Sequence, residues 1–257
     1  DLFEGLWPID HGVTYNAYLI EDEKTALIDP VRISKVQILL EKIDAVSDLS
    51  EIDYIILHHM EQDHTSSLNV LRGLAPEVTI VGTKKTKEML ASFYGITENV
   101  RVVEDEETFS LGETELKFFS TPFIHWPETM MTYDPGREIL LSGDGFGVFG
   151  ALRGGLFDGE VTDMEFFESE GLRYFANVVA KYNRPVQKAI ERLSDLAVST
   201  VAPSHGLVWR EDPGRILDLY EKWSGYAGGP AEPEVTVVYG SMYGFTERMI
   251  NAVAQGI

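Results

Sequence analysis

The sequence predicts a layered α/β sandwich with mixed sheets, and three observations support this fold class. Predicted strands alternate with predicted helices along most of the chain, yet some strands follow one another directly. A chain that alternates in this way folds into stacked layers of helices and sheets around a shared core. The length of 257 residues is also long for one domain and short for two complete ones.

The N-terminal part contains two short strands, a helix and a third strand. The stretch TYNAYLIEDEKTALIDP is typical of two strands joined by the charged turn EDEK. Apolar residues recur at helical spacing in SKVQILLEKIDAV, and we expect Ser34 to cap this helix. The run DYIILHH predicts a buried strand that ends on histidines, after which Asp63 or Thr65 is expected to cap a helix through SSLNVLRGL.

The same alternation continues through the middle of the chain. We expect the strand VTIVG, the helix TKKTKEMLASFYG, and the strands RVVEDE, ELKFFSTP and EILLSGD. A helical region follows in FFESEGLRYFANVVAKYNRPVQKAIERLSDL, which Pro185 breaks or restarts. The strand LAVSTVAPSHG then leads to the helix DPGRILDLYEKWSG, where Pro213 suits the first turn.

A Gly/Pro-rich stretch divides the chain near its end. We expect a first domain over residues 1–224, a linker over 225–234, and one βα unit over 235–257. A doubly wound domain needs several such units, so this chain is expected to lack most of its second domain.

Composition excludes several classes of function. The net charge of −21, from 42 acidic and 21 basic residues, disfavours binding to nucleic acids. No apolar run approaches the ~20 residues that span a membrane, so no membrane partner is expected. Cysteine is absent, so any metal must bind nitrogen and oxygen ligands. A cytoplasmic location fits this composition.

Six metal-capable side chains lie just past the carboxyl ends of predicted strands, where α/β sheets gather their ligands. They are His59, Glu61, Asp63, His125, Asp144 and His205. A single histidine after a strand is usually a loop or capping residue, but six such residues indicate a dinuclear metal site. Of the other histidines, His64 is a borderline candidate, His58 is expected in the core or beside the ligands, and His11 has no assigned role.

Glu61 bears on the choice of metal. A two-zinc hydrolase would be expected to carry a histidine at this position of the HHMEQDH motif. Imidazole ligands suit zinc, iron, copper and nickel, whereas added carboxylates favour harder, more oxidised ions. The residues therefore favour a redox-active di-iron centre. A dinuclear zinc hydrolase and a di-iron oxygen-binding sensor stay open as alternatives.

The spaced motifs resemble those of the flavodiiron proteins, also called A-type flavoproteins or rubredoxin:oxygen oxidoreductases. The resemblance rests on H-x-E-x-D-H from His59 to His64 and on FIHWPETM, LLSGDGFG, APSHGLVWREDPGR and GVTYNAYLI. It implies a metallo-β-lactamase-like αββα sandwich with two non-haem irons, followed by the start of a flavodoxin-like doubly wound domain that binds FMN.

The resemblance also implies roles for individual residues. His59, Glu61 and His125 would hold one iron, Asp63 and His205 the other, and Asp144 would bridge them. His64 and Trp126 are expected beside the irons without binding them. Asp10-His11 departs from the family, since some members carry His-Arg there.

A second motif near the C-terminus resembles the phosphate loop of flavodoxins. Its residues are Ser241, Met242, Tyr243, Gly244, Phe245 and Thr246. Hydroxyl groups and amides at a helix N-terminus can bind the FMN phosphate, which fits a loop between a strand and a helix.

Two further patterns need an interpretation. The run from Gly145 to Gly150 satisfies G-x-G-x-x-G, but glycine-rich sequence follows it instead of a helix, so a dinucleotide site is not expected. Four aromatic residues, Trp7, Trp126, Phe146 and Phe149, either shield the metal pocket or pack in the core.

The family resemblance implies an enzyme that reduces dioxygen to water, nitric oxide to nitrous oxide, or both. FMN would re-reduce the irons, and a head-to-tail homodimer would bring the flavin of one subunit close to the irons of the other. Rubredoxin, another flavoprotein or a reduced deazaflavin would supply the electrons.

Overall fold

The computed structural model describes residues 2–3, 7–229 and 235–256. The chain divides into two compact units, Asp1–Gly225 and Tyr226–Ile257, and each unit is described separately below.

The first unit contains two five-stranded sheets. The first sheet has the order β3-β4-β5-β6-β7, in which β3 and β4 are antiparallel and the other neighbours are parallel. Its strands are β3 (Tyr18–Ile20), β4 (Thr25–Ile28), β5 (Ile52–Ile56), β6 (Thr79–Gly82) and β7 (Val100–Val102).

The second sheet has the order β12-β11-β10-β9-β8, and only its β11 and β12 are parallel. Its strands are β8 (Thr108–Ser110), β9 (Glu115–Ser120), β10 (Met130–Asp134), β11 (Ile139–Gly143) and β12 (Thr200–Pro203). The expected sandwich with mixed sheets is confirmed.

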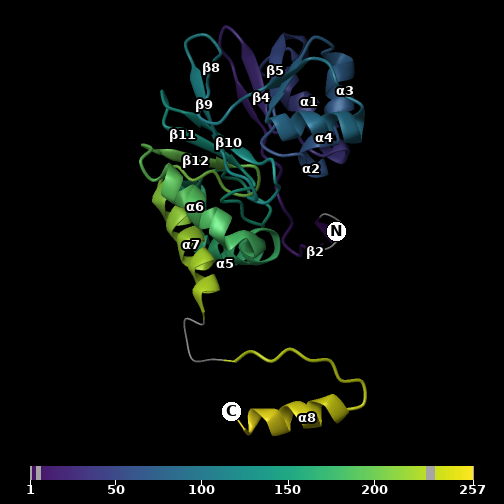
Figure 1. The fold of residues 1–257 in the computed structure, drawn as a ribbon, viewed down its shortest axis with the longest axis vertical. Coiled ribbons are helices and arrows are strands. Elements are labelled where there is room, and N and C mark those ends of the chain that lie inside the picture. The colour runs from purple at the N-terminus through teal and green to yellow at the C-terminus, as the bar shows by residue number, and fades with distance from the viewer. Residues whose placement is uncertain (1, 4–6, 230–234, 257) are drawn as a thin grey trace. The chain divides into compact units, whose positions relative to one another are not determined.

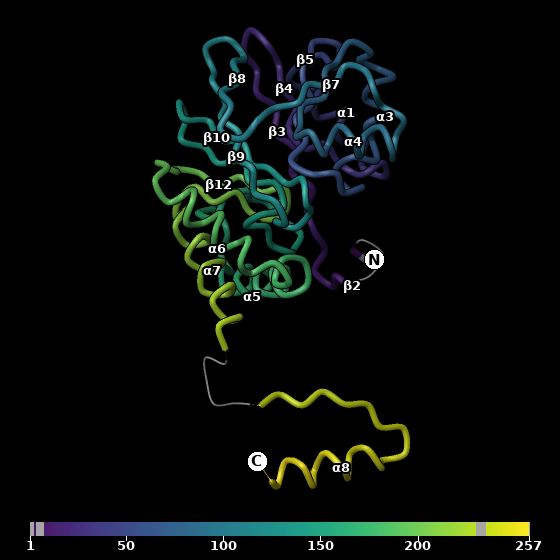
Figure 2. Tube along the Cα trace, viewed as in Figure 1, coloured from purple at the N-terminus to yellow at the C-terminus, as the bar shows by residue number. Residues whose placement is uncertain are grey.

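Helices cover the outer face of each sheet. The helices α1 (Val36–Asp44), α3 (Leu68–Leu74) and α4 (Lys84–Tyr94) lie on the side of the first sheet, and α5 (Met164–Tyr174), α6 (Asn183–Leu193) and α7 (Pro213–Gly225) lie on the side of the second (Figure 1). The chain builds the two halves of this sandwich one after the other, as the colours of the trace show (Figure 2). A small ribbon of β1 (Leu2–Phe3) and β2 (Trp7–Pro8) precedes them.

The apolar core follows this layering. One buried cluster joins the first sheet to its helices, a second joins the second sheet to α5, α6 and α7, and a third fills the space between the sheets. The helix α4 illustrates how local sequence sets an element. The Thr83 side chain accepts a hydrogen bond from the Thr86 amide at its start, and Gly95, with φ 68°, ends it.

Several sequence predictions need correction. Ser34 does not cap α1, because it lies inside a 3₁₀ turn, Ile33–Lys35, that precedes the helix. Neither Asp63 nor Thr65 caps α3, because both lie in the one-turn helix α2 (Gln62–Thr65). The strands β8 and β10 were not predicted. Pro185 does mark a restart of the helical region, since it stands in the first turn of α6 after a π-helical segment, Phe175–Val179.

The second unit contains the helix α8 (Phe245–Ala254) and an extended segment before it. Residues 235–240, the expected strand of the βα unit, have no strand partner among the described residues and form no strand here; because a strand needs a neighbour to satisfy its backbone hydrogen bonds, the βα unit stays a prediction. Part of the expected linker, residues 230–234, lies outside the described residues. Of the helices in the described ranges, none is both long enough and apolar enough to cross a membrane.

Candidate metal centre

The ends of four strands deliver the six predicted ligand residues to one place. The loop after β5 carries His59 and Glu61, and the short helix α2 that follows it carries Asp63. The other three residues follow β9, β11 and β12, in that order: His125, Asp144 and His205. The structure therefore brings all six residues together, as the rule for strand ends predicts.

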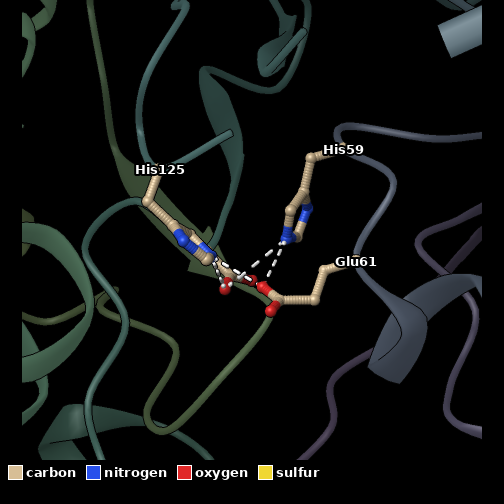
Figure 3. A group of neighbouring side chains, drawn as sticks. His59, Glu61 and His125 are labelled. Atoms are coloured by element: carbon tan, nitrogen blue, oxygen red, sulfur yellow. Dashed lines mark hydrogen bonds and ion pairs between the residues drawn. The ribbon is translucent and has the colours of Figure 1, made fainter. Parts of the chain in front are cut away.

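The first group of ligand atoms surrounds the Glu61 carboxylate. His125 Nε2 lies 2.8 Å from Glu61 Oε2 and 3.2 Å from Asp144 Oδ2. His59 Nε2 lies 3.5 Å from Glu61 Oε2 and 3.6 Å from Asp144 Oδ2. The side chains of His59, Glu61 and His125 point toward one another (Figure 3).

A second group gathers on the other oxygen of Asp144. His205 Nε2 lies 3.4 Å from Asp144 Oδ1 and 3.3 Å from Asp63 Oδ2. His64 Nε2 joins this group, at 3.1 Å from Asp144 Oδ1 and 3.4 Å from Asp63 Oδ2. The two oxygens of Asp144 therefore face different groups: Oδ2 faces the first group and Oδ1 faces the second. His64, expected only beside the ligands, stands as close to the carboxylates as His205 does.

The donor atoms fit a pair of metal ions. Each group offers at least three nitrogen or oxygen atoms that lie within 4.8 Å of one another. Asp63 is buried, yet within the described part of the chain neither of its carboxylate oxygens has a hydrogen-bond partner. A buried carboxylate without a hydrogen bond is costly unless it binds a cation, so Asp63 fits the role of a metal ligand.

The backbone orients two of the imidazole rings. His205 Nδ1 lies 2.7 Å from the Thr14 carbonyl oxygen, and His64 Nδ1 lies 3.3 Å from the Pro30 carbonyl oxygen. A proton on each Nδ1 can be donated to these carbonyls, which leaves each Nε2, facing the carboxylates, able to bind a metal ion once its own proton is displaced.

The charges of the site stabilise one another. Burial alone would raise the pKa of Glu61, but His125 and His59 lower it to about 2. Burial would lower the pKa of His125 and His64, but their carboxylate neighbours, Asp144 for both, raise these values to about 10 and about 9. Burial would likewise raise the pKa of Asp144, but its histidine neighbours lower it. Glu61 and Asp144 are therefore ionised at neutral pH, and bound cations would replace protons held by His125 and His64.

A buried network around Asp29 ties the two sheets together beneath the site. Asp29 Oδ2 lies 2.5 Å from His58 Nδ1, and Asp29 Oδ1 accepts a hydrogen bond from the His58 amide at 2.9 Å. The Ser204 hydroxyl donates to Asp29 Oδ2 at 3.1 Å, and His58 Nε2 lies 2.8 Å from Thr132 Oγ1. The network joins residues next to His59 and His205, so His58 has the supporting role that the sequence left open.

Aromatic side chains cover the site from the second sheet. The Tyr174 hydroxyl donates to Asp144 Oδ2 at 3.0 Å, and its ring packs on Phe149 with centroids 4.9 Å apart. Phe149 therefore contacts Tyr174, which contacts the ligand residue Asp144, and it belongs to the buried core beside the second sheet. Phe146 instead packs on Tyr220 in the core, with centroids 5.1 Å apart.

The mouth of the site is a cavity of about 430 Å³. Its lining includes the predicted ligands Glu61 and Asp63 together with Tyr15, Arg32 and Trp126. The Trp126 ring lies 6.4 Å from that of His59, which places it beside the ligands as expected. The Arg32 guanidinium donates to the Tyr15 hydroxyl at 3.4 Å.

Other predicted residues lie elsewhere. His11 packs against Phe166 in a different cavity, with ring centroids 5.1 Å apart. The side chain of Trp7 lies outside the described residues. No helix follows the glycines at 145–150, which agrees with the rejection of a dinucleotide site. Near the C-terminus, Gly244, with φ 80°, forms the N-cap of α8, so the loop 241–246 leads into a helix as expected.

Sequence reasoning missed three residues that support the site: Asp29, Glu128 and Tyr174. Asp29 comes directly after β4, so the rule for strand ends that found the ligands could have found it as well. Glu128 stands three residues after His125, within the FIHWPETM motif, and Tyr174 ends a helix, so neither residue lies directly after a strand.

Comparisons with known proteins agree with this geometry. The family model described as "ODP family beta lactamase" matches residues 13–206. The solved structure of the flavodiiron protein from Giardia intestinalis superposes with a TM-score of 0.89 at 35% identity, covering 99% of this chain and 62% of that one. The chain belongs to the flavodiiron proteins. Rubredoxin oxygen:oxidoreductase from Desulfovibrio gigas also superposes on this flavodiiron chain, with a TM-score of 0.91 at 31% identity, covering 98% and 63%. The metallo-β-lactamase-like sandwich is thereby confirmed.

The curated relatives that match this flavodiiron chain are longer than it is. A nitric oxide reductase from Moorella thermoacetica is 34% identical over 251 residues, which cover 96% of this chain and 61% of the relative. An anaerobic nitric oxide reductase flavorubredoxin from Escherichia coli O1:K1 / APEC is 37% identical over 250 residues, covering 96% and 51%. The chain therefore spans between about half and three fifths of these relatives' lengths.

Proposed function

We propose that this chain is the metal-binding part of a di-iron flavoprotein oxidoreductase that reduces dioxygen to water, nitric oxide to nitrous oxide, or both. The observation that carries the proposal is the position of Asp144, which presents one oxygen to each of two groups of ligand atoms. The names of the relatives, nitric oxide reductase and rubredoxin oxygen:oxidoreductase, support the choice of gases.

The assignment of ligands follows the two groups. His59, Glu61 and His125 would hold one iron, Asp63 and His205 the other, and Asp144 would bridge them. When bound, the pair of ferrous ions would supply electrons to a diatomic gas. The negative charge of the three carboxylates offsets the charge of the cations, and it favours iron over zinc because carboxylate oxygens suit harder ions.

Residues around the ligands would support the reaction. Tyr174 holds a proton on its hydroxyl group 3.0 Å from Asp144 Oδ2, which makes this hydroxyl a proton source within the site. The buried rings of Phe149 and Tyr174 exclude water on that side. The substrate would enter at the opposite side, through the cavity lined by Tyr15 and Trp126.

The remaining parts of the proposal concern the FMN domain, the assembly and the electron donor. Residues 1–224 would form the di-iron domain, 225–234 a linker, and 235–257 the first βα unit of an FMN domain, in which Ser241–Thr246 would contact the phosphate. A head-to-tail homodimer in the cytoplasm would bring FMN close to the irons of the partner subunit. Rubredoxin, a flavoprotein or a reduced deazaflavin would deliver the electrons.

Gas consumption tests the proposal. The chain joined to a complete FMN domain, purified anaerobically and loaded with iron, should consume dioxygen or nitric oxide when a reductant is added. The same protein with Asp144→Ala should consume neither, because it lacks the residue shared by both metal positions. An iron-loaded protein that consumes neither gas would refute the proposal and favour the sensor. Hydrolysis of esters or thioesters by a zinc-loaded protein would favour the hydrolase.

A further inference from the structure

Glu128 is a buried acidic side chain outside the set of ligands. It is 3% exposed, and its Oε1 accepts a hydrogen bond from the Met60 amide at 2.8 Å. Its other oxygen, Oε2, is buried and has no hydrogen-bond partner among the described residues. Burying a carboxylate is costly, and only one of the two Glu128 oxygens has a hydrogen bond to offset that cost, so its place in the fold needs a reason.

The hydrogen bond to Met60 connects Glu128 to the proposed metal ligands. Met60 stands between His59 and Glu61, so its amide belongs to the backbone that carries both residues. A second hydrogen bond, from the Met130 amide to the His58 carbonyl oxygen at 3.0 Å, lies on the other side of His59. The two hydrogen bonds bracket His59 and attach its loop to the segment that follows β9.

The segment that carries Glu128 also carries His125, and it is held by its own hydrogen bonds. The Thr121 amide donates to the Thr129 carbonyl oxygen at 2.9 Å, and the Phe123 amide donates to the Trp126 carbonyl oxygen at 2.7 Å. The Thr129 hydroxyl also donates to the Trp126 carbonyl oxygen at 2.7 Å. His125 and Glu128 therefore belong to one braced loop.

We infer that Glu128 is a positioning residue, which sets the distance of His125 from His59 and Glu61 and thereby the metal affinity of the position these three residues share. This inference rests on the proposed metal centre and names a residue that controls one of its two positions. Among the described residues no hydrogen bond joins the Glu128 side chain to Asp63 or His205, so the second position, which these two residues form, keeps its affinity when Glu128 is changed.

Cobalt binding tests the inference without depending on iron or on gas reduction. The metal-free chain is titrated anaerobically with Co²⁺ against a competing chelator, and the visible absorption of cobalt reports the coordination at each position. Glu128→Ala should weaken binding at the first position by ~10–100-fold and leave the second unchanged, as is typical when a residue that supports a metal ligand is removed. Glu128→Gln should restore the affinity and the absorption spectrum, because the amide oxygen can still accept from Met60.

A matched control separates positioning from general loss of stability. Asp134 is also 3% exposed and accepts hydrogen bonds from the Gly136 and Arg137 amides, but it lies at the end of β10 remote from Met130. Asp134→Ala should lower the melting temperature and leave both cobalt affinities unchanged.

Three results would overturn the inference: Glu128→Ala binding both ions as the unaltered chain does, equal weakening of both positions, or failure of Glu128→Gln to restore the affinity. If the unaltered chain bound no pair of cobalt ions, the proposed metal centre would fail and this inference with it.

Discussion

At the scale of single residues, Glu61 sets the character of the metal site. Its Oε2 lies 2.8 Å from His125 Nε2, and its lowered pKa, about 2, keeps it charged at neutral pH. The site has three carboxylates in place of the two that a histidine at this position would leave. This difference favours a hard, oxidisable ion.

Replacing Glu61 by histidine should shift the metal preference toward zinc. A neutral imidazole would remove one negative charge and add a ligand that zinc accepts readily. Metal analysis of protein from cells supplied with both metals should show zinc replacing most of the iron. Glu41→His, at an exposed position on α1, is the matched control and should not change the ratio. An unchanged iron content in Glu61→His would show that the carboxylate does not select the metal.

A second residue-scale prediction concerns acid stability. The Asp158 carboxylate is 5% exposed and accepts hydrogen bonds from the Arg210, Glu211 and Asp212 amides at 2.8, 2.9 and 2.8 Å. Burial would raise the pKa of Asp158, but these amides outweigh it and lower the pKa below its usual value. Its stabilisation is therefore complete above the unfolded pKa of about 3.9 and is lost as pH falls through the folded value.

Urea unfolding of the metal-free chain checks this prediction. Asp158→Asn should lower the free energy of unfolding by about 1–3 kcal/mol at pH 7, because an amide oxygen accepts weaker hydrogen bonds than a carboxylate. The difference from the unaltered chain should shrink as pH falls below about 4, where the aspartate becomes protonated first in the unfolded chain and, at lower pH, in the folded one. A difference that stays constant down to pH 3 would mean that the charge of Asp158 contributes nothing.

At the scale of elements, the turn after β12 depends on Gly206. This residue follows His205 and has φ 85°, a left-handed conformation that favours glycine. A Cβ atom at this position would lie 2.1 Å from Val148 Cγ2 and 2.7 Å from the Val148 carbonyl oxygen. The Val148 amide donates to the His205 carbonyl oxygen, so displacing Val148 would also move the proposed ligand His205.

Gly206→Ala should therefore destabilise the chain and weaken metal binding. We expect a loss of about 3 kcal/mol or more, from backbone strain and the steric clash together. Gly95→Ala is the control: its φ is 68°, but a Cβ atom there would meet nothing within 4 Å, so only about 1 kcal/mol should be lost. Chemical unfolding measures both losses. Equal losses in the two variants would show that the contact with Val148 yields easily.

Some helices and strands could be predicted from the sequence and others could not. Local signals sufficed for α4, with Thr83 and Gly95 at its ends, and for α7, which begins at Pro213. They failed for β10, whose five residues are all buried and show no alternation, because its neighbours β9 and β11 define it. The prediction that Asp63 or Thr65 caps a helix was wrong because both side chains have other partners. Thr65 donates to the Glu61 carbonyl oxygen, and Asp63 faces the other ligand residues.

The candidate site was predictable to a similar degree. The six proposed ligands could be found because the carboxyl ends of strands meet at one edge of the sandwich. The supporting residues Glu128 and Tyr174 could not be found, since they reach the site from a loop and a helix whose places depend on distant packing. The distances of His64 Nε2, 3.4 Å from Asp63 Oδ2 and 3.1 Å from Asp144 Oδ1, depend on the fold of α2, and its role beside the irons stays a prediction.

At the scale of the whole molecule, the metal centre joins the two halves of the sandwich. His59, Glu61 and Asp63 come from the first sheet, whereas His125, Asp144 and His205 come from the second. Metal ions bound there would link the sheets and stabilise the folded state in proportion to their affinity. The first unit contains all of these residues and the three clusters of the core, so it holds what is needed for the proposed centre.

The metal content of the protein is the most direct test of the central claim. The chain should be purified anaerobically from cells supplied with iron, and its metals should be measured by elemental analysis. The proposed centre predicts about two irons per chain, one for each group of ligand atoms. Two zinc ions per chain, with iron excluded even when iron is abundant, would contradict the claim and would mean that Glu61 does not select for iron.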